Sequence, residues 1–270
     1  MSSGSIKVET LMNSLHRIHE VSLIAFFSIS MVAIGFALTI LAPPLLNILE
    51  TGAFSLRLSF FKTSLEKHVD VAIMGLFFLV TGLTIFVQMV DEELHEGLSK
   101  LAELIPEFNT SVKLVQYMKL GIAISTIGLV AMVIGAFNHV VTALMLALTG
   151  IALALSCTTR NRDSDYCKSV PFQVRLLIGG LLIMFGIASF TTSRVFPPTV
   201  LTIITGGLLT IISGIGFSIL LAGFDKAFES PTLWIASLMS LTVVLLPVSF
   251  LMLYLELPEI VMKMYGNCCT

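Results

Sequence analysis

The sequence predicts an all-α fold, a polytopic bundle of about seven transmembrane helices with the N-terminus inside the cell. Hydrophobic residues make up 56% of the 270 residues and charged residues only 12%, against roughly 45–50% and about 25% in ordinary soluble domains. The mean hydropathy is +0.98. A soluble chain of this length would need far more charge to cover its surface. The composition alone therefore indicates an integral membrane protein.

Seven apolar segments come close to the roughly 20 residues that a helix needs to cross a bilayer. They cover residues 21–49, 71–90, 120–137, 140–156, 172–190, 199–222 and 232–255. The first is too long for the apolar core of a cleaved signal peptide, and Pro43 and Pro44 should kink it or end it early. Only Asn138 and His139 separate the third segment from the fourth, which predicts a tight helical hairpin.

The distribution of basic residues predicts the orientation. With the N-terminus inside, the inner segments carry twice as many Lys and Arg residues as the outer ones. Polytopic proteins place this excess on the cytoplasmic side. Seven crossings would then leave the C-terminus outside, and the protein would lie in the cell membrane.

The predicted segments group into four parts. Residues 1–20 form an amphipathic lead-in on the inner interface, and residues 21–157 form a four-helix membrane core. Residues 158–169 form a polar inner loop, and residues 170–270 form a three-helix bundle with a short tail.

An amphipathic helix is predicted over residues 91–105, in the inner loop of the four-helix core. Its apolar residues Leu94, Leu98, Leu101 and Ile105 fall at helical spacing. The other face is acidic and carries Glu92, Glu93, Glu96 and Glu103. Such a face suits docking on a basic partner or on the protein's own loops better than contact with anionic lipids. The alternative is a solvated face that closes the bundle.

No Asp, Glu, Lys, Arg or His lies near the middle of a predicted segment. Proton pumps and voltage sensors need such groups, so the sequence disfavours these classes. A path lined by hydroxyls and amides is still open, and its candidates are Thr205, Thr210, Ser213, Ser218 and Gln88. The same hydroxyls, with Gly206, Gly207, Gly214 and Gly216, are also typical of close helix packing.

One constellation could bind a metal or a haem. In the predicted orientation His68, Asp70 and His139 share the outer edge of the membrane. Imidazole binds transition metals and haem iron, and a carboxylate can ligate or orient it. The alternative is hydrogen bonding at the interface. No other cofactor is evident, because the four cysteines, Cys157, Cys167, Cys268 and Cys269, have neither zinc spacing nor a C-x-x-C motif.

Residues 15–156 carry short motifs in a recognisable order. Val69-Asp70 leads into the second segment, which contains Phe77-Phe78. A polar stretch from Asn109 to Lys113 precedes the third segment, and His139-Val140 opens the fourth. In this order they resemble the YqhA-like family of uncharacterised prokaryotic membrane proteins. The resemblance implies a four-helix core and no particular activity, and three further segments follow here that the family lacks.

Three functional hypotheses follow. The first is a structural or assembly subunit of a membrane complex, in contact with the lipid bilayer and with other membrane subunits or further copies of itself. The second is a channel or carrier for a small solute, and the third is a metal or haem protein that uses His68 and His139. No enzyme motif is present, and a net charge of −2 offers no basic surface for nucleic acid.

Overall fold

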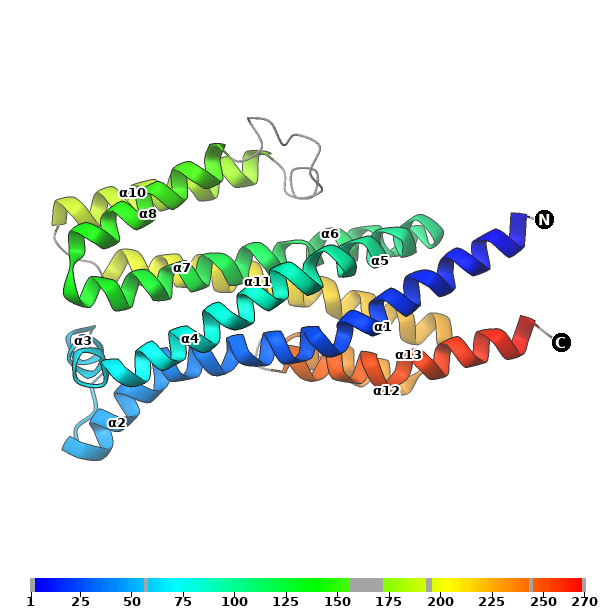
Figure 1. The fold of residues 1–270 in the computed structure, drawn as a ribbon, viewed down its shortest axis with the longest axis horizontal. Coiled ribbons are helices and arrows are strands. Elements are labelled where there is room, and N and C mark those ends of the chain that lie inside the picture. The colour runs from blue at the N-terminus through cyan, green and yellow to red at the C-terminus, as the bar shows by residue number, and fades with distance from the viewer. Residues whose placement is uncertain (1–2, 56–57, 156–171, 193–195, 243–244, 269–270) are drawn as a thin grey trace. The chain divides into compact units, whose positions relative to one another are not determined.

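The computed structural model describes residues 3–55, 58–155, 172–192, 196–242 and 245–268, and all its regular elements there are helical. In chain order they are α1 (Ser3–Phe36), η1 (Ala37–Leu41), α2 (Ala42–Thr51), α3 (Leu58–Lys67), α4 (Val69–Ile85), η2 (Phe86–Val90), α5 (Asp91–Leu104), η3 (Pro106–Phe108), α6 (Asn109–Val115), α7 (Tyr117–Phe137), α8 (His139–Leu155), α10 (Phe172–Thr192), α11 (Phe196–Phe228), α12 (Pro231–Ser240) and α13 (Leu246–Cys268) (Figure 1). The polar loop predicted over residues 158–169 lies outside the described residues.

Five helical stretches in the described part of the chain are long and apolar enough to cross a membrane. They are Thr10–Thr51, Val69–Val90, Pro106–Gly135, Gln173–Phe190 and Pro198–Phe228, and the apolar helix Val140–Leu155 is shorter. Helix hydropathy thus identifies a polytopic membrane protein. The prediction of one continuous helix over residues 232–255 is wrong, because α12 ends at Ser240 and α13 begins at Leu246.

The chain divides into two compact units, each built from separate stretches of sequence. One unit comprises Met1–Val32, Thr81–Leu120 and Leu209–Thr270, and the other comprises Ala33–Val80 and Gly121–Leu208. Helices α1, α4, α7 and α11 contribute residues to both units. Helices α8 and α10, which precede and follow the predicted polar loop, belong to the same unit.

The first apolar segment contains a π-helical turn where its prolines were expected to bend it. Proline has no amide hydrogen, and its ring clashes with the carbonyl four residues earlier in an α-helix. Here residues Ala37–Leu41 adopt the wider π-turn immediately before Pro43, and the amide of Ala42 donates to the carbonyl of Ala37. The helix resumes as α2 and ends at Gly52, whose φ of 66° suits a residue without a side chain.

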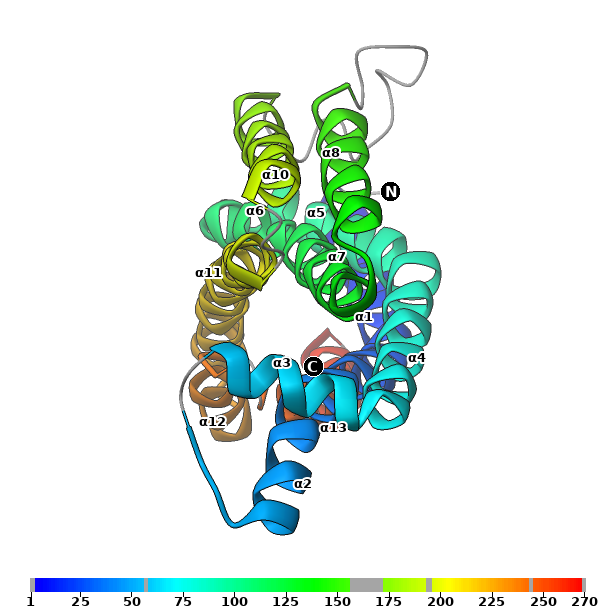
Figure 2. The same cartoon turned by 90° about the vertical axis from the view of Figure 1, so that its left-hand side faces the viewer.

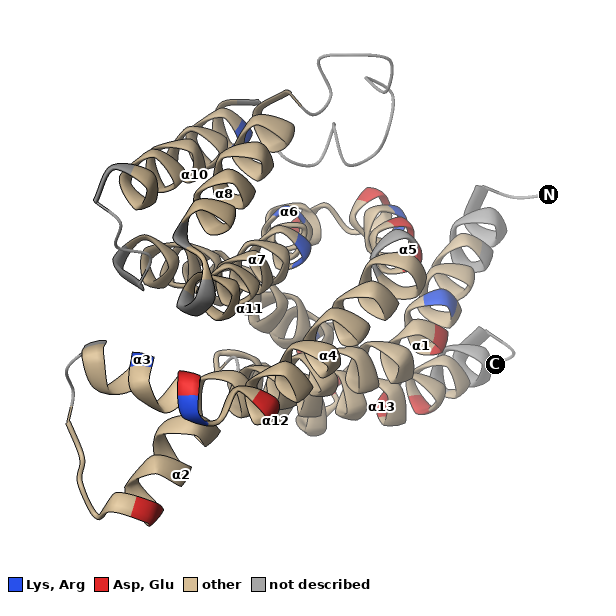
Figure 3. Ribbon diagram, turned by 60° about the vertical axis from the view of Figure 1, so that its left-hand side comes forward, with Lys and Arg blue, Asp and Glu red and all other residues tan. Residues whose placement is uncertain are grey.

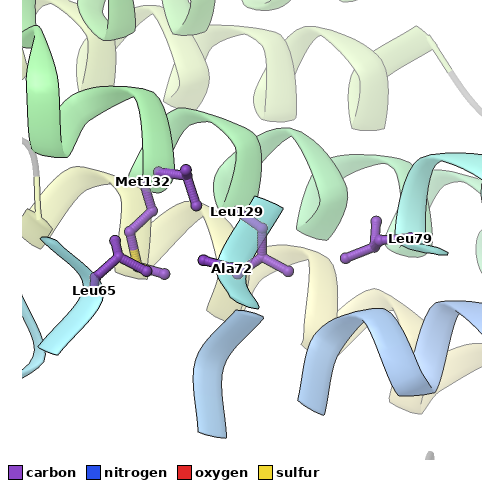
Figure 4. Packing of buried hydrophobic residues seen from close by; sticks show 6 residues of the cluster. Leu65, Ala72, Leu79, Leu129 and Met132 are labelled. Carbon is purple, nitrogen blue, oxygen red and sulfur yellow. The ribbon is translucent and has the colours of Figure 1, made fainter. Parts of the chain in front are cut away.

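In the second unit, α1 and α4 approach until their backbones touch. A Cβ atom on Gly35 would lie 2.7 Å from the carbonyl oxygen of Gly75, so only glycine fits there. Beside this contact lies an apolar cluster to which α3, α4 and α7 contribute. Its buried members include Leu65, Ala72, Leu79, Leu129 and Met132 (Figure 4).

Helices α8 and α10 run side by side as a pair (Figures 1 and 2). Their contact again depends on glycine, because a Cβ on Gly179 would lie 2.7 Å from the carbonyl of Gly150 and 2.9 Å from the Cβ of Ala154.

The turn between α7 and α8 is capped by Asn138, whose side-chain oxygen accepts the amide of Val140 at 3.0 Å. This is the position predicted for the tight hairpin.

In the first unit, α1 packs along α5, and α6 packs along α11. Leu15 and Ile18 of α1 are buried, as are Leu94, Leu98 and Leu101 of α5. Between α6 and α11, a Cβ on Gly216 would overlap the Cβ of Leu114, and the ring of Phe108 in η3, just before α6, lies 5.3 Å from that of Phe224. Apolar stripes therefore hold both pairs of helices together.

Long stretches of several helices carry no charged residue. Most of α4, α7, α8 and α11 carries no Lys, Arg, Asp or Glu (Figure 3). The outward face of α11 is a stripe of exposed apolar side chains at helical spacing, comprising Leu201, Ile204, Leu208, Ile211, Ile215 and Ile219. A stripe of this kind suits lipid contact, since large apolar patches are rare on soluble surfaces.

Replacing Gly179 by valine should destabilise the α8–α10 pair, because the new side chain has to displace the backbone of Gly150. Overpacking of this kind costs about 1–3 kcal/mol. Gly180→Val is the matched control, since no atom lies within 4 Å of the position of a Cβ on Gly180. Thermal unfolding in detergent should show a lower Tm for Gly179→Val than for Gly180→Val. Equal values would contradict the close approach.

Candidate functional site

Helices α12 and α13 form an antiparallel hairpin. Ser230 has extended backbone and precedes Pro231, the first residue of α12, where a missing amide hydrogen costs nothing. The hydroxyl of Ser230 donates to Oε2 of Glu256 at 2.9 Å, and further along the pair the hydroxyl of Ser249 donates to the carbonyl of Ala236 at 2.9 Å. The two bonds tie the base and the middle of the hairpin.

The end of α12 meets α11 near the middle of its apolar stretch. A Cβ on Gly214 would lie 2.7 Å from the carbonyl oxygen of Ser240, and Gly214 is central in the stretch Pro198–Phe228. The rings of Phe217 and Phe250 stack nearby at 4.4 Å. At a rise of about 1.5 Å per residue, α12 is about 15 Å long, or half of an apolar layer about 30 Å thick. The hairpin therefore reaches half the depth that α11 covers.

Five hydroxyl groups lie between the middle and the end of the hairpin or on the adjoining turn of α11, and each donates its hydrogen to a backbone carbonyl. Ser213 donates to Thr210, Ser237 to Trp234, Ser240 to Ser237, Thr242 to Met239 and Ser249 to Ala236. A hydroxyl that has given away its hydrogen can offer only lone pairs to a ligand. Four of these hydroxyls are buried, and the oxygen of the fifth, exposed Thr242, also accepts the amide of Leu245 at 3.3 Å.

The tip is exposed rather than covered. Leu241, Thr242 and Leu245 are exposed, and Leu241 shows 46% of its surface. Backbone that leaves the helical conformation at membrane depth is tolerated where it is buried in protein or lines water, because hydrocarbon offers no hydrogen bonds.

The residues predicted to line a polar path differ in their burial. Ser213 is fully buried, and Thr210 and Ser218 are nearly so. Thr205, in contrast, is half-buried with its hydroxyl bonded to the carbonyl of Leu201. Gln88 is exposed within η2. The predicted set therefore does not form one continuous lining, because a helix turns these positions to different faces.

The predicted packing glycines also differ from one another. Gly206 lies against Ser125 of α7, and a Cβ on Gly216 would lie 3.0 Å from the carbonyl of Ser111 on α6. Gly214 meets the hairpin tip, as described above. Around Gly207 no atom lies within 4 Å of the position of a Cβ. Three of the four positions are thus close approaches, each to a different helix.

The predicted metal or haem constellation is only partly described. His68 is mostly buried, and its Nε2 atom lies 3.8 Å from Oε1 of Glu50, which also pairs with Lys67. Asp70 is exposed, and the side chain of His139 lies outside the described residues. Among the residues that the structure describes, no three His, Cys, Asp or Glu side chains could hold one metal ion. A metal or haem at His68 and His139 stays a prediction.

The predicted acidic face of α5 turns partly toward the chain's own first helix. Arg17 of α1 pairs with Glu93 at 3.2 Å and also with Glu96, which accepts a further bond from Lys100 at 2.6 Å. The bond from Lys100, aided by the charge of Arg17, holds the pKa of Glu96 below its ordinary value of 4.5. Glu103 is exposed, and the side chain of Glu92 lies outside the described residues.

The hairpin is the feature that hydropathy did not reveal. Its sequence signals are Ser230-Pro231, which begins a helix, and the polar interruption at Ser240 and Thr242 followed by Pro247. A window of about 20 residues averages across that break and returns one segment.

No protein-family model matches the chain, and no curated protein or solved structure matches it either. The resemblance of residues 15–156 to the YqhA-like family therefore stays a prediction.

Replacing Arg17 by glutamine should loosen α5 at neutral pH. Because the pKa of Glu96 is lowered in the folded protein, its contribution is present above pH 4.5 and is lost as the pH falls through the folded value. We expect the α5 amides of Arg17→Gln to exchange about two- to fivefold faster than wild type at pH 7. The difference should shrink on acidification. Glu103→Gln serves as the control, and equal protection of wild type and Arg17→Gln at pH 7 would contradict the pairing.

Proposed function

We propose that this protein is a channel or carrier for a small solute in the cell membrane. The observation that carries the proposal is the contact between Ser240, at the end of α12, and Gly214, in the middle of the apolar stretch of α11. Half-length helices that meet a full-length helix at mid-depth are a recurrent way of building transport sites. Such helix ends bring backbone oxygen atoms into a layer that otherwise lacks polar groups.

The hairpin changes the proposed path of the chain through the membrane. Six crossings, by α1–α2, α4, α7, α8, α10 and α11, return the chain to the inner side. The hairpin then enters and leaves on that side, which puts the C-terminus inside with the N-terminus. Lys263 moves to the inner side and increases the excess of inner basic residues. Exposed Trp234, four residues into α12, suits a position at the interface.

The solute site in this proposal is electrically neutral. Residues 199–224 of α11 and 231–255 of the hairpin contain no Asp, Glu, Lys, Arg or His. Transport coupled to protonation of a side chain at the tip is thus disfavoured. Passive permeation, or a carrier driven by the gradient of the solute itself, fits the residues present.

Purified protein in liposomes should conduct at least one of three probes, K⁺, Cl⁻ or glycerol. Gly214→Leu should reduce that flux about tenfold or more, because a side chain there collides with the carbonyl of Ser240 and displaces the tip. Gly207→Leu, in open space on the same helix, is the matched control and should keep wild-type flux. Ion efflux and light-scattering assays measure the three probes.

Monodispersity in detergent would show that both variants fold, and Gly214→Ala would supply a milder variant if the leucine variant aggregates. The absence of flux for all three probes would refute the proposal. Equal flux in folded Gly214→Leu and Gly207→Leu would refute the role of the tip.

An assembly subunit of a membrane complex is the second candidate. It is favoured by two accessible acidic residues of α5: Glu103 is exposed, and Glu93 keeps 52% of its side chain exposed although it pairs with Arg17. A basic segment of a neighbouring subunit would fit this face. Native mass spectrometry after mild solubilisation should then detect a stoichiometric partner, lost in a Glu93→Gln/Glu103→Gln variant. A preparation free of other subunits would remove this candidate.

A further inference from the structure

Helices α2 and α3 lie at the end of the bundle where α4 begins. Within this unit, α3 runs across the axis of α4 rather than along it, and α2, which follows the π-turn Ala37–Leu41, diverges from α4 (Figures 1 and 2). The stretch Val69–Val90, which contains α4, is long and apolar enough to cross a bilayer. A helix that lies across such a span runs along the membrane surface, as interfacial helices do.

Helix α3 has one apolar face and one polar face. Leu65 is buried in the cluster that also contains Ala72 and Met132, so this face of α3 packs on the bundle. The other face is polar, and its exposed residues are Ser59, Lys62, Thr63, Glu66 and Lys67. Because such a face needs water or lipid headgroups, α3 marks the level at which the apolar layer ends.

Polar contacts hold α2 against α3. The side-chain amide of Asn47 donates to the hydroxyl of Ser64 at 2.9 Å, and both residues are buried. Lys67 of α3 also pairs with Glu50 of α2. The face of α2 that carries Asn47 is therefore covered by the chain itself, and a different face is turned outward.

The outward face of α2 is an exposed apolar stripe. Leu41, Leu45 and Leu49 recur every four residues, and Leu49 is 81% exposed. Phe54, just beyond the end of α2, is exposed as well. The stripe continues the exposed apolar surface of α1, which includes Ile34. Since the apolar spans of this chain contact lipid, continuity with that surface favours lipid as the neighbour of α2 too.

The charges of α3 do not favour an anionic surface. Lys62 lies 3.7 Å from Glu66, and Lys67 pairs with Glu50. Attraction to anionic headgroups depends on an excess of basic residues, and each of these lysines is matched by an acid. The apolar side chains of α2 therefore have to supply the attachment to the membrane.

We infer that the α2–α3 hairpin is an interfacial anchor in which Leu45, Leu49 and Phe54 insert into the acyl chains of the adjacent leaflet. Helix α3 lies at the level of the headgroups, with its polar face toward water. The ligand of this surface is thus the lipid acyl chain, irrespective of headgroup charge. The inference is independent of whether the protein conducts a solute.

The test uses tryptophan fluorescence of full-length protein in phosphatidylcholine vesicles. Trp234 is the chain's single tryptophan, so reporters are added to a Trp234→Phe background. Leu49→Trp reports on the apolar stripe, and Thr63→Trp on the polar face of α3 is the matched control. Lipids brominated on acyl carbons near the headgroup should lower the emission of Leu49→Trp about twofold or more and leave Thr63→Trp nearly unchanged. Iodide on both sides of the membrane should show the reverse order.

Phe54→Trp is a second reporter that replaces one exposed aromatic ring by another, for use if Leu49→Trp is not monodisperse in detergent. Quenching of the stripe reporter by iodide as strong as that of Thr63→Trp would overturn the inference, because α2 would then face water. Shielding from both quenchers would also overturn it, because a second copy or another subunit would then cover the stripe. A loss of solute flux in the same vesicles would bear on the transport proposal alone.

Discussion

The backbone of a membrane protein has to satisfy its own hydrogen bonds, and the described part of this chain is organised by that requirement. Hydrocarbon supplies no partners for amides and carbonyls, so every stretch at membrane depth is driven into a helix. Where the α-helical ladder is interrupted, the structure supplies a local substitute. Thr39 in the π-turn bonds to the carbonyl of Gly35 at 2.8 Å, and Ser249 bonds to the carbonyl of Ala236 across the hairpin. At both places a side-chain hydroxyl donates to a backbone carbonyl.

Close backbone approach is the second consequence of the same environment. Apolar burial does not drive helices together in lipid, so packing depends on contact area and on small residues. Gly35 with Gly75 and Gly150 with Gly179 let backbones touch within one unit. Gly214 does the same for the carbonyl of Ser240. In the sequence, a glycine at the contact of two long helices cannot be distinguished from a glycine that contacts the end of a short helix.

The sequence therefore predicted the helices better than it predicted the contacts between them. Six of the seven apolar segments coincide with helices, because length and composition determine them. The acidic helix was also predictable, since Leu94, Leu98 and Leu101 are periodic and are indeed buried. The break between Ser240 and Leu246 was missed because hydropathy sums composition over a window and carries no information on antiparallel folding. The partners of Thr205 and Gly207 could not be predicted either, because residues on one helix face different neighbours that only the tertiary structure defines.

The hairpin combines a fixed base with an uncovered tip. At the base, Ser230 bonds to Glu256, and the ring of Tyr254 stacks on His19 of α1 at 4.4 Å. Halfway up, Phe217 and Phe250 stack with both rings fully buried. Beyond them only Gly214 meets the end of α12 among the contacts described here, and Leu241, Thr242 and Leu245 are exposed. The base and the middle of the hairpin are thus held by hydrogen bonds and stacked rings, and the end of α12 is held by the glycine of α11 that admits its carbonyl.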